Sequence, residues 1–94
     1  MMQKEVRAHI IVVGKVQGVG YRAFAQLHAT KFGLGGWVQN CSDGTVEIEV
    51  EGKKEIIEAL LEQLRKGPLF SRVETLQVDW REANRQTEGF KILK

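Results

Sequence analysis

The sequence predicts an α+β domain in which two helices cover one face of an antiparallel sheet. Three observations lead to this prediction. Several short stretches alternate apolar and polar residues with a period of two, as half-buried strands do. Two longer stretches repeat apolar residues at the spacing of an amphipathic helix. Glycine-rich or turn-forming segments separate them, and the order is strand, helix, strand, strand, helix, strand, with a short strand at the end.

Length and composition limit what kind of protein this is. A chain of 94 residues forms a single domain, spanning residues 1–94, because a second core would not fit. Its net charge of +2 is too small to indicate a nucleic-acid or membrane partner. The single cysteine, Cys41, cannot form an internal disulfide, and no apolar run resembles a signal peptide or a membrane span. We therefore expect a cytoplasmic protein.

The first strand is expected at residues 6–13, where alternate residues from Val6 to Val12 form the more apolar face. The first helix is expected to begin near Tyr21 and to end at Gly33. Its apolar stripe contains Tyr21, Phe24, Ala25, His28, Ala29 and Phe32. We interpret His28 as a packed side chain rather than a catalytic one, because a histidine in such a stripe usually packs.

A second strand at residues 37–40 and a turn at 42–44 lead into the third strand. In that strand the apolar residues Val46, Ile48 and Val50 alternate with the acidic residues Glu47, Glu49 and Glu51. The alternation predicts that the apolar side chains face the core and that the carboxylates face outward. Carboxylates with this period could bind a metal, but they are more typical of a solvated sheet surface. We expect a solvated surface.

The second helix is expected at residues 53–66, before the stop signal Gly67-Pro68. Its buried stripe contains Ile56, Ile57, Leu60, Leu61 and Leu64. A fourth strand at 73–81, with Leu76, Val78 and Trp80 inward, a polar loop at 82–88 and a final strand at 90–92 complete the chain. This order matches the split-βαβ, ferredoxin-like plan, in which right-handed crossovers place both helices on one face of the sheet.

The connection between the first strand and the first helix is rich in glycine: Gly14-Lys15-Val16-Gln17-Gly18-Val19-Gly20-Tyr21-Arg22. Its glycines allow a tight turn that directs several amides to one point, and such a turn before a helix is an anion site. Arg22 adds a planar fork of donors that matches phosphate. From spacing alone, an ordinary connection with a solvated arginine is an equally good interpretation. The spacing fits neither a Walker A loop nor a G-x-G-x-x-G fingerprint.

This loop resembles the first signature of the acylphosphatases, and Gly36-Trp37-Val38-Gln39-Asn40-Cys41-Ser42-Asp43-Gly44-Thr45-Val46-Glu47 resembles their second signature. The resemblance continues through Gly67-Pro68 to Gly89-Phe90-Lys91-Ile92, and so covers essentially the whole chain. It implies the same ferredoxin-like fold. It also implies hydrolysis of an acyl phosphate to a carboxylate and inorganic phosphate.

Carried over residue by residue, the resemblance implies that Arg22 binds the phosphate and that Asn40 positions the attacking water. It further implies a phosphate cradle made of the amides of Lys15, Val16, Gln17, Gly18, Val19, Gly20 and Tyr21. Without the resemblance we would interpret Asn40 as a backbone cap of the following turn. The side-chain amide of asparagine both donates and accepts, so it can orient a water, but it is too weak a base to take a proton.

Other chemistries find less support. His9 and His28 with one cysteine show no zinc spacing, so we expect no metal or other cofactor. A non-catalytic RNA-binding or phosphate-binding module is the alternative. RNA is disfavoured because the expected outer face carries charged residues such as Arg7 and Glu49 instead of stacking aromatics, whereas a phosphate-binding regulatory domain stays open. We expect a monomer that acts on a small-molecule acyl phosphate, which the sequence does not specify.

Overall fold

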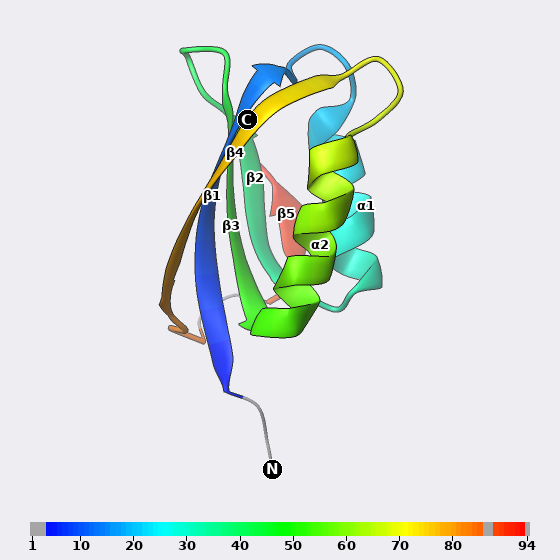
Figure 1. The fold of residues 1–94 in the computed structure, drawn as a ribbon. Helices are drawn as coiled ribbons and strands as arrows, with labels where there is room; N and C mark the ends of the chain where they lie inside the picture. Colours follow the sequence, from blue (N-terminus) through cyan, green and yellow to red (C-terminus); the bar gives the residue numbers. More distant parts are fainter. Residues whose placement is uncertain (1–3, 86–87, 94) are drawn as a thin grey trace.

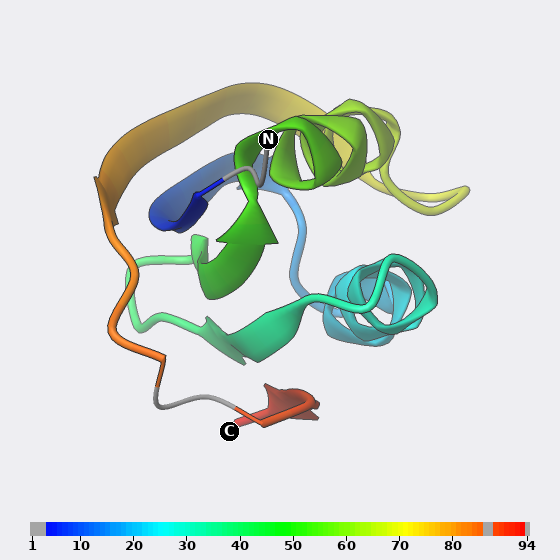
Figure 2. The ribbon, with the colours of Figure 1, turned by 90° about the horizontal axis from the view of Figure 1, so that it is seen from below.

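The computed structural model describes residues 4–85 and 88–93. Its elements are β1 (Glu5–Lys15), α1 (Tyr21–Lys31), β2 (Gly35–Asn40), β3 (Val46–Lys53), α2 (Lys54–Lys66), β4 (Arg72–Glu82) and β5 (Phe90–Ile92). Both helices lie on one face of a twisted sheet, as the ferredoxin-like plan requires (Figures 1 and 2). The α+β fold predicted from the sequence is therefore confirmed. The polar loop expected at 82–88 includes residues 86 and 87, which lie outside the described residues.

The sheet has the strand order β4-β1-β3-β2-β5. β1 is antiparallel to both β3 and β4, so that Ala8 lies opposite Val50 on one side and Trp80 on the other. β2 is antiparallel to β3, but β5 pairs with β2 in parallel, so the sheet is mixed rather than wholly antiparallel. The cause is the route of the chain. β4 ends at the end of the sheet where β2 begins, so a strand added beyond β2 runs in the direction of β2 (Figure 1).

The core lies between the sheet and the helices, and the apolar alternation predicted it well. Its residues are Ala8, Ile10, Val12, Val16, Tyr21, Ala25, Ala29, Leu34, Val38, Val46, Ile48, Val50, Ile57, Leu60, Leu61, Leu64 and Phe90. The stripe of α1 is narrower than predicted, because Phe32 at its end is 36% exposed. No helix within residues 4–85 and 88–93 is long and apolar enough to cross a membrane.

Trp80 and His28, at the margins of the core, each contact a neighbouring side chain. Trp80 lies opposite the buried Ala8, but it is 36% exposed because β4 is an edge strand. The ammonium of Lys54 lies 5.1 Å from the centre of its ring, a cation–π contact that covers it. The ring of His28 lies 4.5 Å from that of Phe24 between centroids, which supports the interpretation of His28 as a packed side chain.

The outer face of the sheet is not the solvated surface that the sequence predicted. Glu49 and Glu51 are each only 7% exposed, and Glu47 is half-buried. The Nε2 atom of His9 lies 2.6 Å from a carboxylate oxygen of Glu47, and Nε of Arg7 lies 3.3 Å from one of Glu49. The hydrogen bond from His9, with a second from Gln39, holds the pKa of Glu47 below its usual range. Opposite charges across neighbouring strands therefore permit this burial.

Glu51 is buried for a different reason. Its two carboxylate oxygens accept the backbone N–H groups of Asn84 and Arg85, at 2.6 and 2.9 Å. These residues follow β4, on the way to β5 at the other edge of the sheet. The segment thus passes over the outer end of β3 and covers the carboxylate. The sequence pattern could not predict this, because the path of the segment depends on where β5 pairs.

A glycine substitution tests the packing of β2 against β3. Gly36 has a φ of +143°, and a Cβ atom there would lie 1.9 Å from the carbonyl oxygen of Glu49. Because backbone must move to relieve this clash, we expect Gly36→Ala to lower the free energy of unfolding by about 3 kcal/mol or more. Urea unfolding measures this change.

Gly33 provides the matched control. Its φ is +71°, but a Cβ atom there meets nothing within 4 Å. Gly33→Ala should therefore cost only the intrinsic penalty of a left-handed alanine, about 1 kcal/mol. Equal losses in the two variants would contradict the close approach at Gly36.

Candidate functional site

The loop between β1 and α1 turns on two glycines with left-handed backbone. Gly18 has a φ of +74° and Gly20 a φ of +80°. Gly20 is also the N-cap of α1, where no side chain bonds to the first amides, and the first turn of the helix contains no acidic residue. The N–H groups that begin a helix have no partners within it, and the positive end of the helix dipole is there. This end of α1 therefore favours an anion.

Asn40, the last residue of β2, precedes a turn that other residues stabilise. The Asp43 carboxylate accepts hydrogen bonds from the amide and hydroxyl of Thr45, at 3.0 and 2.7 Å, and these bonds lower the pKa of Asp43. Oδ1 of Asn40 is buried and has no hydrogen-bond partner among the described residues. It therefore does not cap the turn, which was the alternative interpretation from sequence. Leaving a buried acceptor unpaired is costly, and such an atom calls for an explanation.

The loop and Asn40 line one cavity of about 200 Å³. It is lined by Val16, Gly18, Gly20, Tyr21, Arg22, Ala23, Asn40 and Ile92. Five of the eight loop positions that the sequence analysis named, from Lys15 to Arg22, thus line one cavity with Asn40. The other three do not: Lys15 pairs with Arg72 in the sheet, Val19 packs against the core, and Gln17 contacts the turn after Asn40.

The side chain of Gln17 connects the loop to this turn. Its Nε2 atom donates to the carbonyl oxygens of Cys41 and Thr45, at 2.8 and 2.9 Å. From the sequence, only the backbone amide of Gln17 was expected to take part in the site. The side-chain contact was missed because it joins residues 24 and 28 positions apart, and local patterns contain no signal for such a contact.

The end of the chain also belongs to the site, which the sequence analysis did not predict. Ile92 lines the cavity, and Nη1 of Arg22 donates to the carbonyl oxygen of Leu93 at 3.2 Å. Parallel pairing of β5 with β2 brings these residues to the start of α1, and the amide of Leu93 in turn donates to Val38 at 2.8 Å. The carbonyl of Leu93, at the end of the chain, therefore helps to orient the side chain of Arg22.

Other titratable side chains near the loop have structural roles. The hydroxyl of Tyr21 is buried and donates to the carbonyl of Leu64 at 2.7 Å, and burial raises its pKa above the usual range. Tyr21 therefore keeps its proton and contributes only backbone to the cavity. The thiol of Cys41 is half-buried, 3.9 Å from a carboxylate oxygen of Glu47. In the part of the chain that the structure describes, no three His, Cys, Asp or Glu side chains could hold a metal ion together.

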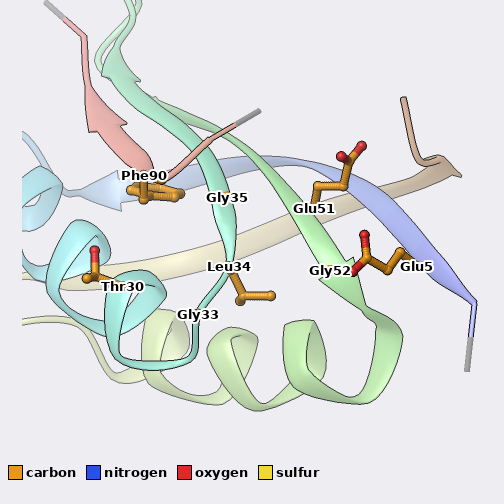
Figure 3. A pocket seen from close by; sticks show the side chains of 9 residues that line it. Glu5, Thr30, Gly33, Leu34, Gly35, Glu51, Gly52 and Phe90 are labelled. Carbon is orange, nitrogen blue, oxygen red and sulfur yellow. The ribbon is translucent and has the colours of Figure 1, made fainter. Parts of the chain in front are cut away.

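A second pocket, of about 310 Å³, lies at the opposite end of the sheet (Figure 3). It is lined by Glu5, Thr30, Gly33, Leu34, Gly35, Glu51, Gly52, Gly89 and Phe90. Its ionisable lining side chains are two carboxylates, and that of Glu51 already accepts two backbone amides. Despite its greater volume, this pocket is unsuited to an anion.

Comparisons with known proteins agree on one family. Residues 8–92 match the family model described as Acylphosphatase. The chain is 43% identical over 88 residues to a Salinibacter ruber acylphosphatase, covering 94% of this chain and 93% of that one. It is 46% identical over 90 residues to one from Thermococcus kodakarensis, with 96% and 98% covered. The crystal structure of acylphosphatase from Bacillus subtilis is similar with a TM-score of 0.92 and 38% identity, over 95% of this chain and 99% of that one.

The geometry predicts that inorganic phosphate binds at the start of α1. Because the folded state alone has this site, phosphate at a hundred times its dissociation constant should stabilise the fold by about 2.7 kcal/mol. Thermal unfolding in phosphate, compared with chloride of equal ionic strength, measures the effect. Arg22→Gln should abolish most of the gain. A melting temperature that responds equally to both salts would rule out a specific phosphate site.

Proposed function

Since the chain belongs to the acylphosphatase family, whose reaction is the hydrolysis of acyl phosphates, we propose that it carries out this reaction in the cavity between the loop and Asn40. One observation carries the proposal. The cavity that Arg22 and Asn40 line lies at the start of α1, where no side chain caps the first amides. An anion site and a side chain able to bind water thus line one small cavity.

The phosphoryl group is bound by Arg22 and by amides of the loop from Lys15 to Tyr21, of which Val16, Gly18, Gly20 and Tyr21 line the cavity. A guanidinium has five N–H donors in a rigid fork. One terminal nitrogen of Arg22 donates to Leu93, which fixes the plane of the fork and leaves the remaining donors for phosphate oxygens. Charge that develops on the phosphoryl oxygens in the transition state is then stabilised by groups already in place, at no cost of reorganisation.

Asn40 orients the water. The side-chain amide of Asn40, which lines the cavity, binds the water and directs a lone pair of the water oxygen towards phosphorus. The new bond forms between that oxygen and phosphorus while the bond from phosphorus to the carboxyl oxygen breaks. The carboxylate leaves with the electron pair. The proton of the water passes to an oxygen of the phosphoryl group, because asparagine cannot take it.

This mechanism needs no general acid, since a carboxylate is a good leaving group without protonation. We also expect no requirement for a metal. Positioning and charge stabilisation are the main demands of phosphoryl transfer, and one arginine with several amides supplies both. A regulatory domain that binds phosphate without turnover would use the same cradle, so turnover must be measured.

The decisive experiment is hydrolysis of a small aryl acyl phosphate by the purified chain in the presence of a strong chelator. We expect turnover that the chelator leaves unchanged. Asn40→Ala should lower kcat about a hundredfold or more, the effect of losing one preorganised polar contact, while stabilisation by phosphate persists. Stabilisation by phosphate without turnover would instead indicate a binding domain. Activity lost with chelator and restored by Mg²⁺ or Zn²⁺ would disprove the mechanism.

Arg22→Lys separates the geometry of the fork from its charge. Lysine keeps the charge but meets phosphate as a single flexible point, and it cannot hold two oxygens while also bonding to Leu93. Misplacement of the phosphoryl group by about 1 Å can cost a hundredfold in rate. We therefore expect kcat/KM of Arg22→Lys to fall almost as far as that of Arg22→Gln. The phosphate-free unfolding midpoints should change little, because Arg22 makes a single exposed hydrogen bond, to Leu93, among those described. A lysine variant with most of the activity would show that charge suffices.

A further inference from the structure

We infer that the side chain of Gln17 is a positioning residue for the reaction, which holds the phosphate cradle and Asn40 at a fixed separation. This inference rests on the proposed function. It differs from the role that the family resemblance implies for Gln17, which concerns only its backbone amide. The observation behind it is the pair of hydrogen bonds that join the loop to the turn after Asn40.

Both N–H bonds of the Gln17 side-chain amide are used. One is donated to the carbonyl of Cys41 and the other to that of Thr45, at 2.8 and 2.9 Å. These carbonyls stand at the two sides of the turn after β2, because the amide of Cys41 also donates to Thr45 at 2.9 Å. Gln17 thus bridges the two sides of the turn, because the two N–H donors of its amide match two carbonyl acceptors.

The bonds act directly beside the groups that the mechanism uses. Cys41 follows Asn40 in the chain, so a shift of the Cys41 peptide moves the base of the Asn40 side chain. Gln17 precedes Gly18, which lines the cavity. One side chain therefore ties the residue next to the water-binding group to the residue next to the cradle.

The bonds within the loop and within the turn do not by themselves fix the distance between the two. The loop turns on the left-handed glycines Gly18 and Gly20, both exposed, and glycine restricts the backbone least of all residues. The turn is stabilised within itself by Asp43 and Thr45, but these exposed bonds do not reach the loop. Beyond the pairing of β1 and β2 with β3, Gln17 therefore joins the loop and the turn directly.

Loss of the Gln17 hydrogen bonds should affect folding stability and the catalytic rate to different extents. A typical hydrogen bond contributes about 1 kcal/mol to stability, so a domain of this size survives the loss of two. A displacement of about 1 Å can reduce the rate a hundredfold. Removing the Gln17 bonds should therefore affect kcat far more than folding.

The first experiment compares two glutamine-to-methionine variants, which keep side-chain length and remove the donors. We expect Gln17→Met to lower kcat about tenfold or more, while the phosphate dissociation constant from thermal shift changes less than about threefold, because the cradle amides stay. Gln39→Met is the control. Gln39 is also half-buried and adjacent to Asn40, but its amide donates to Glu47 at 2.8 Å on the outer face. Equal kcat values for the two variants would overturn the inference.

A double variant identifies the residue through which Gln17 acts. If Gln17 serves to place Asn40, Gln17→Met should have little further effect on kcat in an Asn40→Ala background. Full multiplication of the two losses would show that Gln17 acts independently of Asn40, contrary to the inference.

A charged variant adds a pH-dependent readout that a merely structural role would not produce. Gln17→Glu puts acceptors opposite the two carbonyls, so kcat should be low at neutral pH. Protonation of the carboxyl restores one donor, so the kcat ratio to the parent should rise as pH falls through the carboxyl pKa, ordinarily about 4.3. A ratio that is flat with pH would count against positioning through these bonds.

One readout does not depend on turnover. In the phosphate-bound protein, the NMR resonances of the Asn40 side-chain amide should shift in Gln17→Met and stay in place in Gln39→Met. Unmoved resonances would overturn the inference even if the chain hydrolyses acyl phosphates. Shifted resonances in a protein without turnover would instead contradict only the proposed function.

Discussion

The position of β3 between β1 and β2 is the constraint on which the site depends. Because β3 pairs antiparallel with both, β1 and β2 run in the same direction and end at the same end of the sheet. The glycine loop follows β1 and Asn40 ends β2, so strand pairing alone brings the anion site and the asparagine to one edge (Figure 1). β5 is parallel to β2 and ends there as well, which adds Ile92 and Leu93. Three segments far apart in sequence thus meet without any long loop.

The outer face of the sheet supports this arrangement. Glu51 accepts the amides of Asn84 and Arg85, and so holds the segment that follows β4 across the end of β3. From there the chain reaches the far edge, where β5 can pair with β2. Burial of a carboxylate is costly, and here backbone N–H groups offset that cost. The carboxylate of Glu51 on the outer face thus acts on the site indirectly, through the segment that leads to β5.

Structure that depends on residues close together in the sequence could be predicted, whereas contacts between distant segments could not. Alternation from Val46 to Glu51 predicts a strand and its buried face, because burial of one face is a local pattern. The glycine spacing before Tyr21 fits an anion loop and an ordinary connection equally well. The burial of Glu49 and Glu51 was not predictable, since their partners come from a neighbouring strand and from the segment after β4. Nor were the contacts of Gln17 with Cys41 and Thr45, which depend on how two loops meet. Asn40 is intermediate: only the family resemblance distinguished it from a turn cap.

A site of this kind places an unusual demand on the fold. With no general acid or base among the proposed groups, the rate depends on distances between backbone amides, one guanidinium and one side-chain amide. Apart from mutation to proline, a substitution leaves the backbone amide of its residue in place, so the precision of these amides comes from strand pairing and from cross-links between loops. The cross-links found here, Gln17 to the turn and Arg22 to Leu93, are single side chains that donate to main-chain carbonyls. The bonds of Gln17 fix a separation without adding a charge beside Arg22. A neutral side chain with two donors, such as that of Gln17, is accordingly suited to hold together an anion site built from backbone.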